Sequence, residues 1–193
     1  MRDRLKRRVI PRLVVLLSQV TWPARARAGL RRALGGRGRV DLYFAFDDAS
    51  SAVAVLDLVD RLDGRPIDLV LRPVVERGIP DDPAADDKRR HAIADARRLA
   101  RRRLLTLRRV QPVSPATTAP LAAHAAALDD DARRTFSADA LRRLWIDGDD
   151  VGASAAADGE AVRANERAMV ASGPYDTPEI GRASCRERVS VVV

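Results

Sequence analysis

The sequence predicts an α/β protein built on one strand–helix–strand unit and completed by further helices. Residues 40–46 are apolar apart from Asp41, with Gly38 shortly before them and Asp47 directly after, which is typical of a buried strand. Apolar residues then recur at helical spacing from Ala52 to Leu62, and residues 67–75 form a second apolar run. Because these three elements follow within about 35 residues, we expect the two strands to be parallel neighbours.

The first helix is expected to begin at Asp48. The segment Asp47-Asp48-Ala49-Ser50-Ser51 follows the first strand directly, and Asp and Ser side chains accept hydrogen bonds from the first amides of a helix. Asp63-Gly64 predicts the end of the same helix, since glycine readily adopts the conformation that terminates one.

A helical insertion is expected to fill residues 76–178. Its helices are predicted at residues 86–107, 119–128, 137–144 and 158–172, with prolines breaking the chain before the second. Arginine runs such as Arg101-Arg102-Arg103 are expected to lie on a solvated helix face, opposite an apolar face that includes Leu104.

The positive charge belongs mainly to the N-terminus. Of a formal net charge of +8, residues 1–39 carry +11 and the tail at 179–193 carries +1, so residues 40–178 carry −4. A mildly acidic body argues against a nucleic-acid-binding fold, and no nucleic acid is expected as a partner.

Residues 1–39 are predicted to form a basic amphipathic helical extension. The preferred interpretation is a helix that docks on the protein's own body or makes peripheral contact with an anionic membrane. A secretory signal is the alternative, because basic residues precede a short apolar stretch; a transmembrane span is excluded by length. We therefore expect a cytoplasmic protein, with an exported or membrane-surface location as the alternative.

Cysteine and histidine are too scarce for redox or metal chemistry. Cys185 is the single cysteine, so a CxxC motif and an internal disulfide are excluded. His91 and His124 lie far apart in the sequence, and no metal site is expected.

The segment 40–51 resembles the opening strand and active-site turn of the DsbA-like class of the thioredoxin superfamily. The nearest branch contains 2-hydroxychromene-2-carboxylate isomerases and kappa-class glutathione transferases. Further similarities span residues 40–175 and include Leu71-Arg72-Pro73, Leu144-Trp145 and Gly173-Pro174-Tyr175. The resemblance implies a thioredoxin-like fold whose βαβ half is residues 40–75.

The resemblance also implies a site at the start of the first helix. In that branch a serine hydroxyl there donates a hydrogen bond to the thiolate of glutathione, so glutathione is the implied cofactor and a small organic molecule the substrate. Asp48 stands at the position of that serine and Ser51 matches the second serine of the motif. These two are the candidate catalytic residues, with helix capping and a polar first turn as the alternative roles. At a helix N-terminus Asp48 is expected to be ionised and unable to donate a hydrogen bond.

The C-terminal run at residues 179–189 resembles a translated sequencing adapter. We therefore expect residues 179–193 to be an artefactual tail outside the fold, with a natural basic tail as the alternative. On this interpretation the fold is truncated near Pro178: its C-terminal hairpin and last helix are missing, and two strands remain.

Two functions follow as hypotheses. The first is an oxidoreductase/isomerase-family enzyme with glutathione-linked small-molecule chemistry. The second is a catalytically inactive thioredoxin-fold module for binding or assembly. The sequence gives no indication of the oligomeric state.

Overall fold

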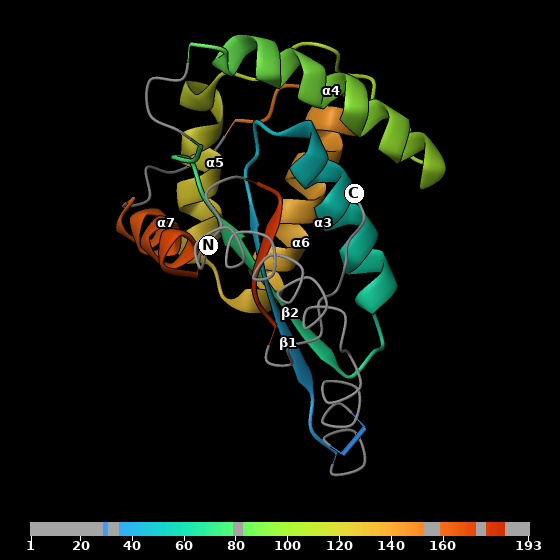
Figure 1. Ribbon diagram of the computed structural model, residues 1–193, viewed down its shortest axis with the longest axis vertical. Coiled ribbons are helices and arrows are strands. Elements are labelled where there is room, and N and C mark those ends of the chain that lie inside the picture. Colours follow the sequence, from blue (N-terminus) through green and yellow to red (C-terminus); the bar gives the residue numbers. More distant parts are fainter. Residues whose placement is uncertain (1–28, 31–34, 79–82, 153–158, 173–176, 184–193) are drawn as a thin grey trace, which may run out of the picture.

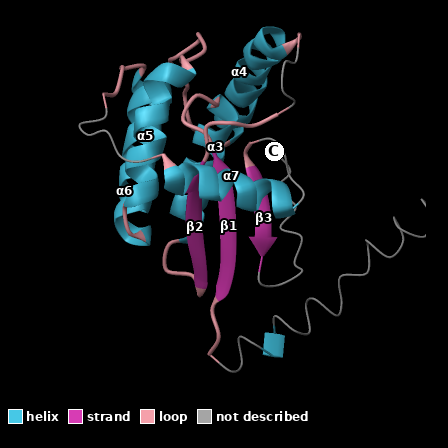
Figure 2. Cartoon of the chain, turned by 90° about the vertical axis from the view of Figure 1, so that its left-hand side faces the viewer, coloured by secondary structure: helices cyan, strands magenta, loops and turns pink. Residues whose placement is uncertain are grey.

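The computed structural model describes residues 29–30, 35–78, 83–152, 159–172 and 177–183, and most of the predicted N-terminal extension, together with Cys185, lies outside them. A three-stranded sheet forms the centre, with helices on both faces (Figures 1 and 2). In chain order the elements are β1 (Gly38–Phe44), α3 (Ala49–Leu62), β2 (Ile67–Pro73), α4 (Ala85–Arg102), α5 (Pro115–Ala127), α6 (Asp130–Leu141), the π-helical turn η1 (Arg142–Asp147), α7 (Glu160–Ser172) and β3 (Glu179–Ala183).

The predicted βαβ unit is confirmed. Strands β1 and β2 are parallel, with Gly38 opposite Ile67 and Phe44 opposite Pro73. Helix α3 connects them and packs on the sheet through its buried face. Strand β1 begins at Gly38, two residues before the predicted start, so the sheet includes the end of the segment assigned to the N-terminal extension.

Strand β1 is buried on both faces, which explains its nearly continuous apolar sequence. Leu42, Phe44 and Phe46 belong to the main core, together with residues of α3, α5 and α6. Tyr43 and Ala45 point the other way, into a smaller cluster that includes Met169 of α7. The alternation follows from the two-residue period of a strand.

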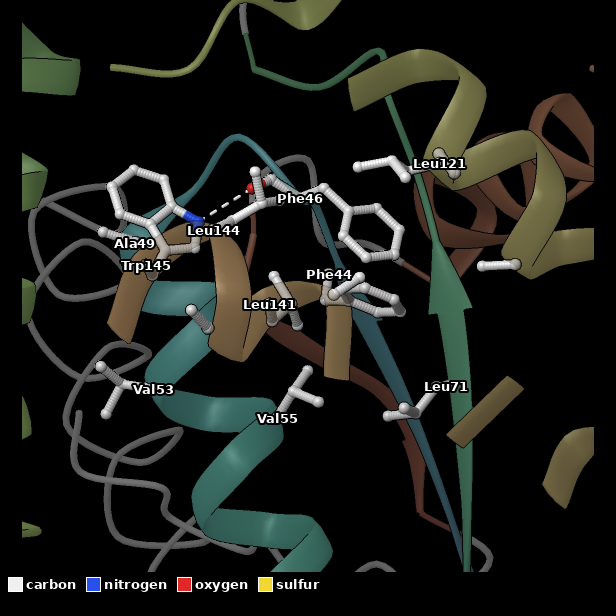
Figure 3. Packing of buried hydrophobic residues seen from close by; sticks show 14 of the residues in the cluster. Phe44, Phe46, Ala49, Val53, Val55, Leu71, Leu121, Leu141, Leu144 and Trp145 are labelled. Carbon is white, nitrogen blue, oxygen red and sulfur yellow. Dashed lines mark hydrogen bonds between the residues drawn. The ribbon is translucent and has the colours of Figure 1, made fainter. Parts of the chain in front are cut away.

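Trp145 anchors the helical insertion to the end of β1. Its side chain is fully buried, and its Nε1 donates a hydrogen bond of 2.9 Å to the carbonyl of Phe46 (Figure 3). Phe46 in turn contacts Phe44 edge-to-face, with ring centroids 5.2 Å apart. The indole therefore fills core volume and satisfies a carbonyl just beyond the strand.

Arg133 provides a second attachment of the insertion. Its Nε donates to the carbonyl of Ala125 at 2.9 Å, near the C-terminus of α5. Its terminal nitrogens donate to the carbonyls of Leu128 and, at 3.4 Å, of Leu71 in β2. One largely buried guanidinium thus satisfies carbonyls at a helix end and on the sheet.

The sheet contains a third strand, which corrects the expectation of two. Strand β3 pairs antiparallel with β1, with Val40 opposite Ala183 and Tyr43 opposite Glu179. Residues 179–183 are therefore part of the fold, contrary to the expectation that the fold ends before residue 179. The prediction treated this run as foreign because it resembles a translated sequencing adapter, whereas its backbone can pair with the open edge of β1 whatever its side chains.

Helix α4 is shorter than predicted. It ends at Arg102, although apolar residues at helical spacing continue beyond it. The chain reverses at Leu104, which has a φ of 58° and is 95% exposed, so its assignment to the apolar face was wrong. The turn instead brings Leu107 into the core.

The two middle helices are longer than predicted. Helix α5 begins at Pro115, the first helical position, where the missing proline amide costs no hydrogen bond. Helix α6 begins after Asp129, whose side chain accepts hydrogen bonds from the amides of Asp131 and Ala132.

Candidate functional site

The turn between β1 and α3 places Asp48 at the start of the helix, as predicted. Asp48 has an extended backbone, and its Oδ1 accepts a hydrogen bond of 3.0 Å from the amide of Ser50. Its Oδ2 accepts one of 3.0 Å from the amide of Ser51. Asp48 is therefore the N-cap of α3, a role that satisfies two amides lacking helical partners.

Ser51 lies against Asp48 but is enclosed in the turn. Its side chain is fully buried, and its Oγ donates a 2.7 Å hydrogen bond to Asp48 Oδ2. The same Oγ accepts a 3.2 Å hydrogen bond from the amide of Ala45. The structure thus brings the two candidate residues together, and the Ser51 hydroxyl holds the turn in shape by using both of its hydrogen-bonding functions.

Burial changes the electrostatics of Asp48. Burial raises the pKa of Asp48 above its ordinary value of 3.8, and the Ser51 hydroxyl and the charge of Arg77 offset part of that rise. Neighbouring Asp47 forms an ion pair of 2.9 Å with Arg77. Desolvation of the carboxylate therefore acts against the stabilisation of the ionised form that the helix start was expected to provide.

A cleft of about 990 Å³ opens at the start of α3. Its floor is the turn at residues 47–50, and its walls come from residues 75–78 after β2, the first half of α4, the start of α5 and the second half of α7. The carboxyl ends of the parallel strands lie at the same end of the sheet, where α/β folds commonly bind ligands. Its volume is in the range of small-molecule sites.

The cleft lining is mixed in charge, with an apolar portion. The basic side chains are Arg77, Lys88, Arg89, Arg163 and Arg167, and the acidic ones are Asp47, Asp48, Glu76 and Glu166. Ile93, Met169 and Val170 contribute apolar surface. Such a lining suits a ligand that carries carboxylates, an ammonium group and an apolar part.

Helix α7 fixes one wall of the cleft. Glu166 Oε1 accepts hydrogen bonds from the amides of Val75 and Glu76, at 2.9 and 2.8 Å. Asn165 Nδ2 donates to the carbonyl of Pro73 at 3.0 Å. These contacts hold the segment after β2 against α7, so its amides cannot also serve a ligand.

Thr177 is a site residue that the sequence analysis missed. Its Oγ1 donates to Asp48 Oδ2 at 3.4 Å, it lines the cleft, and the peptide bond from Thr177 to Pro178 is cis. Thr177 was missed because the fold was expected to end near Pro178, so no contact from this segment to the start of α3 was considered.

Three other polar side chains, those of Arg72, His91 and His124, do not line the cleft. Arg72 forms an ion pair of 2.8 Å with Asp41 and sits on β2, an edge strand. His91 is exposed on α4, and His124 packs edge-to-face against Phe136 with centroids 4.7 Å apart. Among the described residues, no three potential metal ligands cluster, and no helix is long and apolar enough to cross a bilayer.

Comparison with known proteins gives one structural similarity. No family model and no curated protein matches the chain. Its structure is similar to that of 2-hydroxychromene-2-carboxylate isomerase in its selenomethionine form, a DsbA-like thioredoxin-fold protein, with a TM-score of 0.47 and 14% identity. The match covers 72% of this chain and 76% of the isomerase chain.

Proposed function

We propose that this protein binds glutathione, or a closely similar thiol peptide, together with a small organic substrate in the cleft at the start of α3, and performs glutathione-linked small-molecule chemistry. The observation that carries the proposal is the cleft itself, with Asp48 at its floor and basic and acidic side chains on its walls. Dithiol redox chemistry is excluded, since the sequence has a single cysteine.

The lining supports a zwitterionic ligand. Glutathione carries two carboxylates and one ammonium group, and it would supply a nucleophilic thiol. Arg77, Lys88 and Arg89 are suited to the carboxylates, and Glu76 to the ammonium group. Ile93 and Met169 offer an apolar surface for the carbon skeleton of a substrate.

Asp48 is the residue that we propose to face the sulfur. Its raised pKa makes the protonated form more accessible, and a protonated carboxyl can donate a hydrogen bond to an anion. The existing donors to its carboxylate come from Ser50, Ser51 and Thr177. Ser51 is a positioning residue in this proposal, because its hydroxyl is used within the turn.

Calorimetric titration of the full chain with glutathione tests the proposal. Ala92→Trp on α4 fills the cleft and is expected to abolish binding, because Ala92 lines the cleft. Ala94→Trp, two residues along the same helix and exposed, is the matched control and should bind as the native chain does. The assignment of the cleft as the glutathione site would be rejected if the native chain gave no heat at millimolar glutathione, or if both variants lost glutathione binding equally.

A binding module without catalysis is the second candidate function. The observation favouring it is that the Asp48 carboxylate and the Ser51 hydroxyl already satisfy each other and the adjacent amides. Such a saturated pair would need to break a contact before acting on a ligand. Binding of glutathione with no turnover of aromatic carboxylate substrates would select this candidate over the first.

A further inference from the structure

The end of α4 presents a leucine where helices usually place glycine. The amide of Leu105 donates to the carbonyl of Ala100 at 2.9 Å, and the amide of Leu104 donates to that of Arg101 at 3.2 Å. This pair of bonds defines a Schellman turn, whose left-handed position favours glycine. Leu104 occupies that position with a φ of 58° and is 95% exposed. An unfavourable conformation therefore holds an apolar side chain in solvent.

Arginines are frequent in the sequence on both sides of this leucine. Residues 97–110 contain seven arginines and no acidic residue. Within the described part of the chain, Arg97, Arg101 and Arg102 are exposed and form no ion pair, and we call these three the arginine collar. Arg97 and Arg101 also line a groove of about 310 Å³ between α4 and residues 106–107.

The position of this surface leaves it accessible. In Figure 1, α4 crosses one end of the molecule and its C-terminal end projects beyond α3. The groove shares no residue with the cleft, which uses the first half of α4. A flat partner could therefore rest on the end of α4 while the cleft stays open.

We propose that Leu104 and the arginine collar form a docking site for an anionic membrane surface. The leucine inserts at the boundary between headgroups and acyl chains, and the arginines contact lipid phosphates and carboxylates. Charge complementarity and the solvent-exposed leucine favour a membrane over a nucleic acid. Residues 97–110 contain no aromatic side chain on which a base could stack and no Asn or Gln to pair with adenine, and a nucleic acid offers no apolar interior for the exposed Leu104.

Vesicle co-sedimentation of the full chain tests the docking site. Vesicles of phosphatidylcholine are compared with vesicles in which about one third of the lipid is phosphatidylserine. Leu104→Gly is the informative variant, because glycine suits the left-handed turn and should raise the melting temperature. The variant should nevertheless bind the anionic vesicles about tenfold more weakly, so the loss cannot come from unfolding.

Charge variants complete the test. Arg101→Gln is expected to weaken binding to anionic vesicles about fivefold. Arg65→Gln, at an exposed position in the turn between α3 and β2, should change it less than about twofold. The proposal is overturned if Leu104→Gly binds anionic vesicles as tightly as the native chain, or if both arginine variants lose the same amount of vesicle binding. It is also overturned if the protein binds neutral vesicles as well as anionic ones, or if a short single-stranded DNA displaces the protein from the vesicles.

Discussion

Replacing Asp48 with alanine tests how the β1–α3 turn is held together. The variant loses the N-cap of α3, which costs about 1 kcal/mol in typical helices. It also leaves the Ser51 hydroxyl, which is fully buried, without its acceptor, for which a further cost of about 1–3 kcal/mol is expected. We therefore expect Asp48→Ala to lower the free energy of unfolding by about 2–4 kcal/mol.

Asp129→Ala is the matched control. Asp129 caps α6 through the amides of Asp131 and Ala132, but it is exposed and binds no hydroxyl. Its replacement should cost about 1 kcal/mol. Urea unfolding followed by circular dichroism measures both variants, with equal denaturant slopes required for the comparison. If Asp48→Ala costs no more than Asp129→Ala, the account of the buried Asp48–Ser51 pair is wrong.

Four further predictions follow from named contacts. Because the folded-state pKa of Asp48 is raised, the folded protein binds that proton more tightly than the unfolded chain does. The contribution of Asp48 to the free energy of unfolding therefore falls as the pH rises from about 3.8 through the raised value. Unfolding measured at several pH values should show the stability of the native chain declining relative to that of Asp48→Asn over that window. Asp48→Ser replaces a titrating donor with a hydroxyl. Glutathione affinity measured by calorimetry should weaken for the native chain as the pH rises through the raised pKa of Asp48, and this pH dependence should be absent in Asp48→Ser. Trp145→Phe removes the hydrogen bond to the Phe46 carbonyl and opens a cavity, and should cost about 2–4 kcal/mol in urea unfolding; a cost under about 1 kcal/mol would contradict its anchoring role. Arg133→Gln leaves carbonyls at the end of α5 unsatisfied and should cost about 2 kcal/mol, with no measurable loss contradicting the attachment.

The sequence predicts the elements whose signals are local. The βαβ unit follows from the apolar run of β1, the periodicity of α3 and the second run of β2, all within a short stretch. The start of α3 at Asp48 was predictable for the same reason, since a cap depends only on residues two and three positions away.

Features that depend on distant residues could not be predicted in this way. The pairing of β3 with β1 joins segments more than a hundred residues apart, and its sequence carried no strand signal of its own. The cleft needs α4, α7 and Thr177 to converge on Asp48, which no spacing indicates. At the end of α4 the sequence signal is present but misleading. The helical spacing of apolar residues continues through Leu104, although the helix ends at Arg102 and the chain turns away.

A glutathione titration followed by amide NMR shows whether the ligand binds in the cleft at the start of α3. The largest chemical-shift changes are expected on the amides of Ala49, Ser50, Arg77 and Gly78, which line the cleft. Shifts confined to amides outside this cleft, or no shifts at millimolar glutathione, would contradict this expectation.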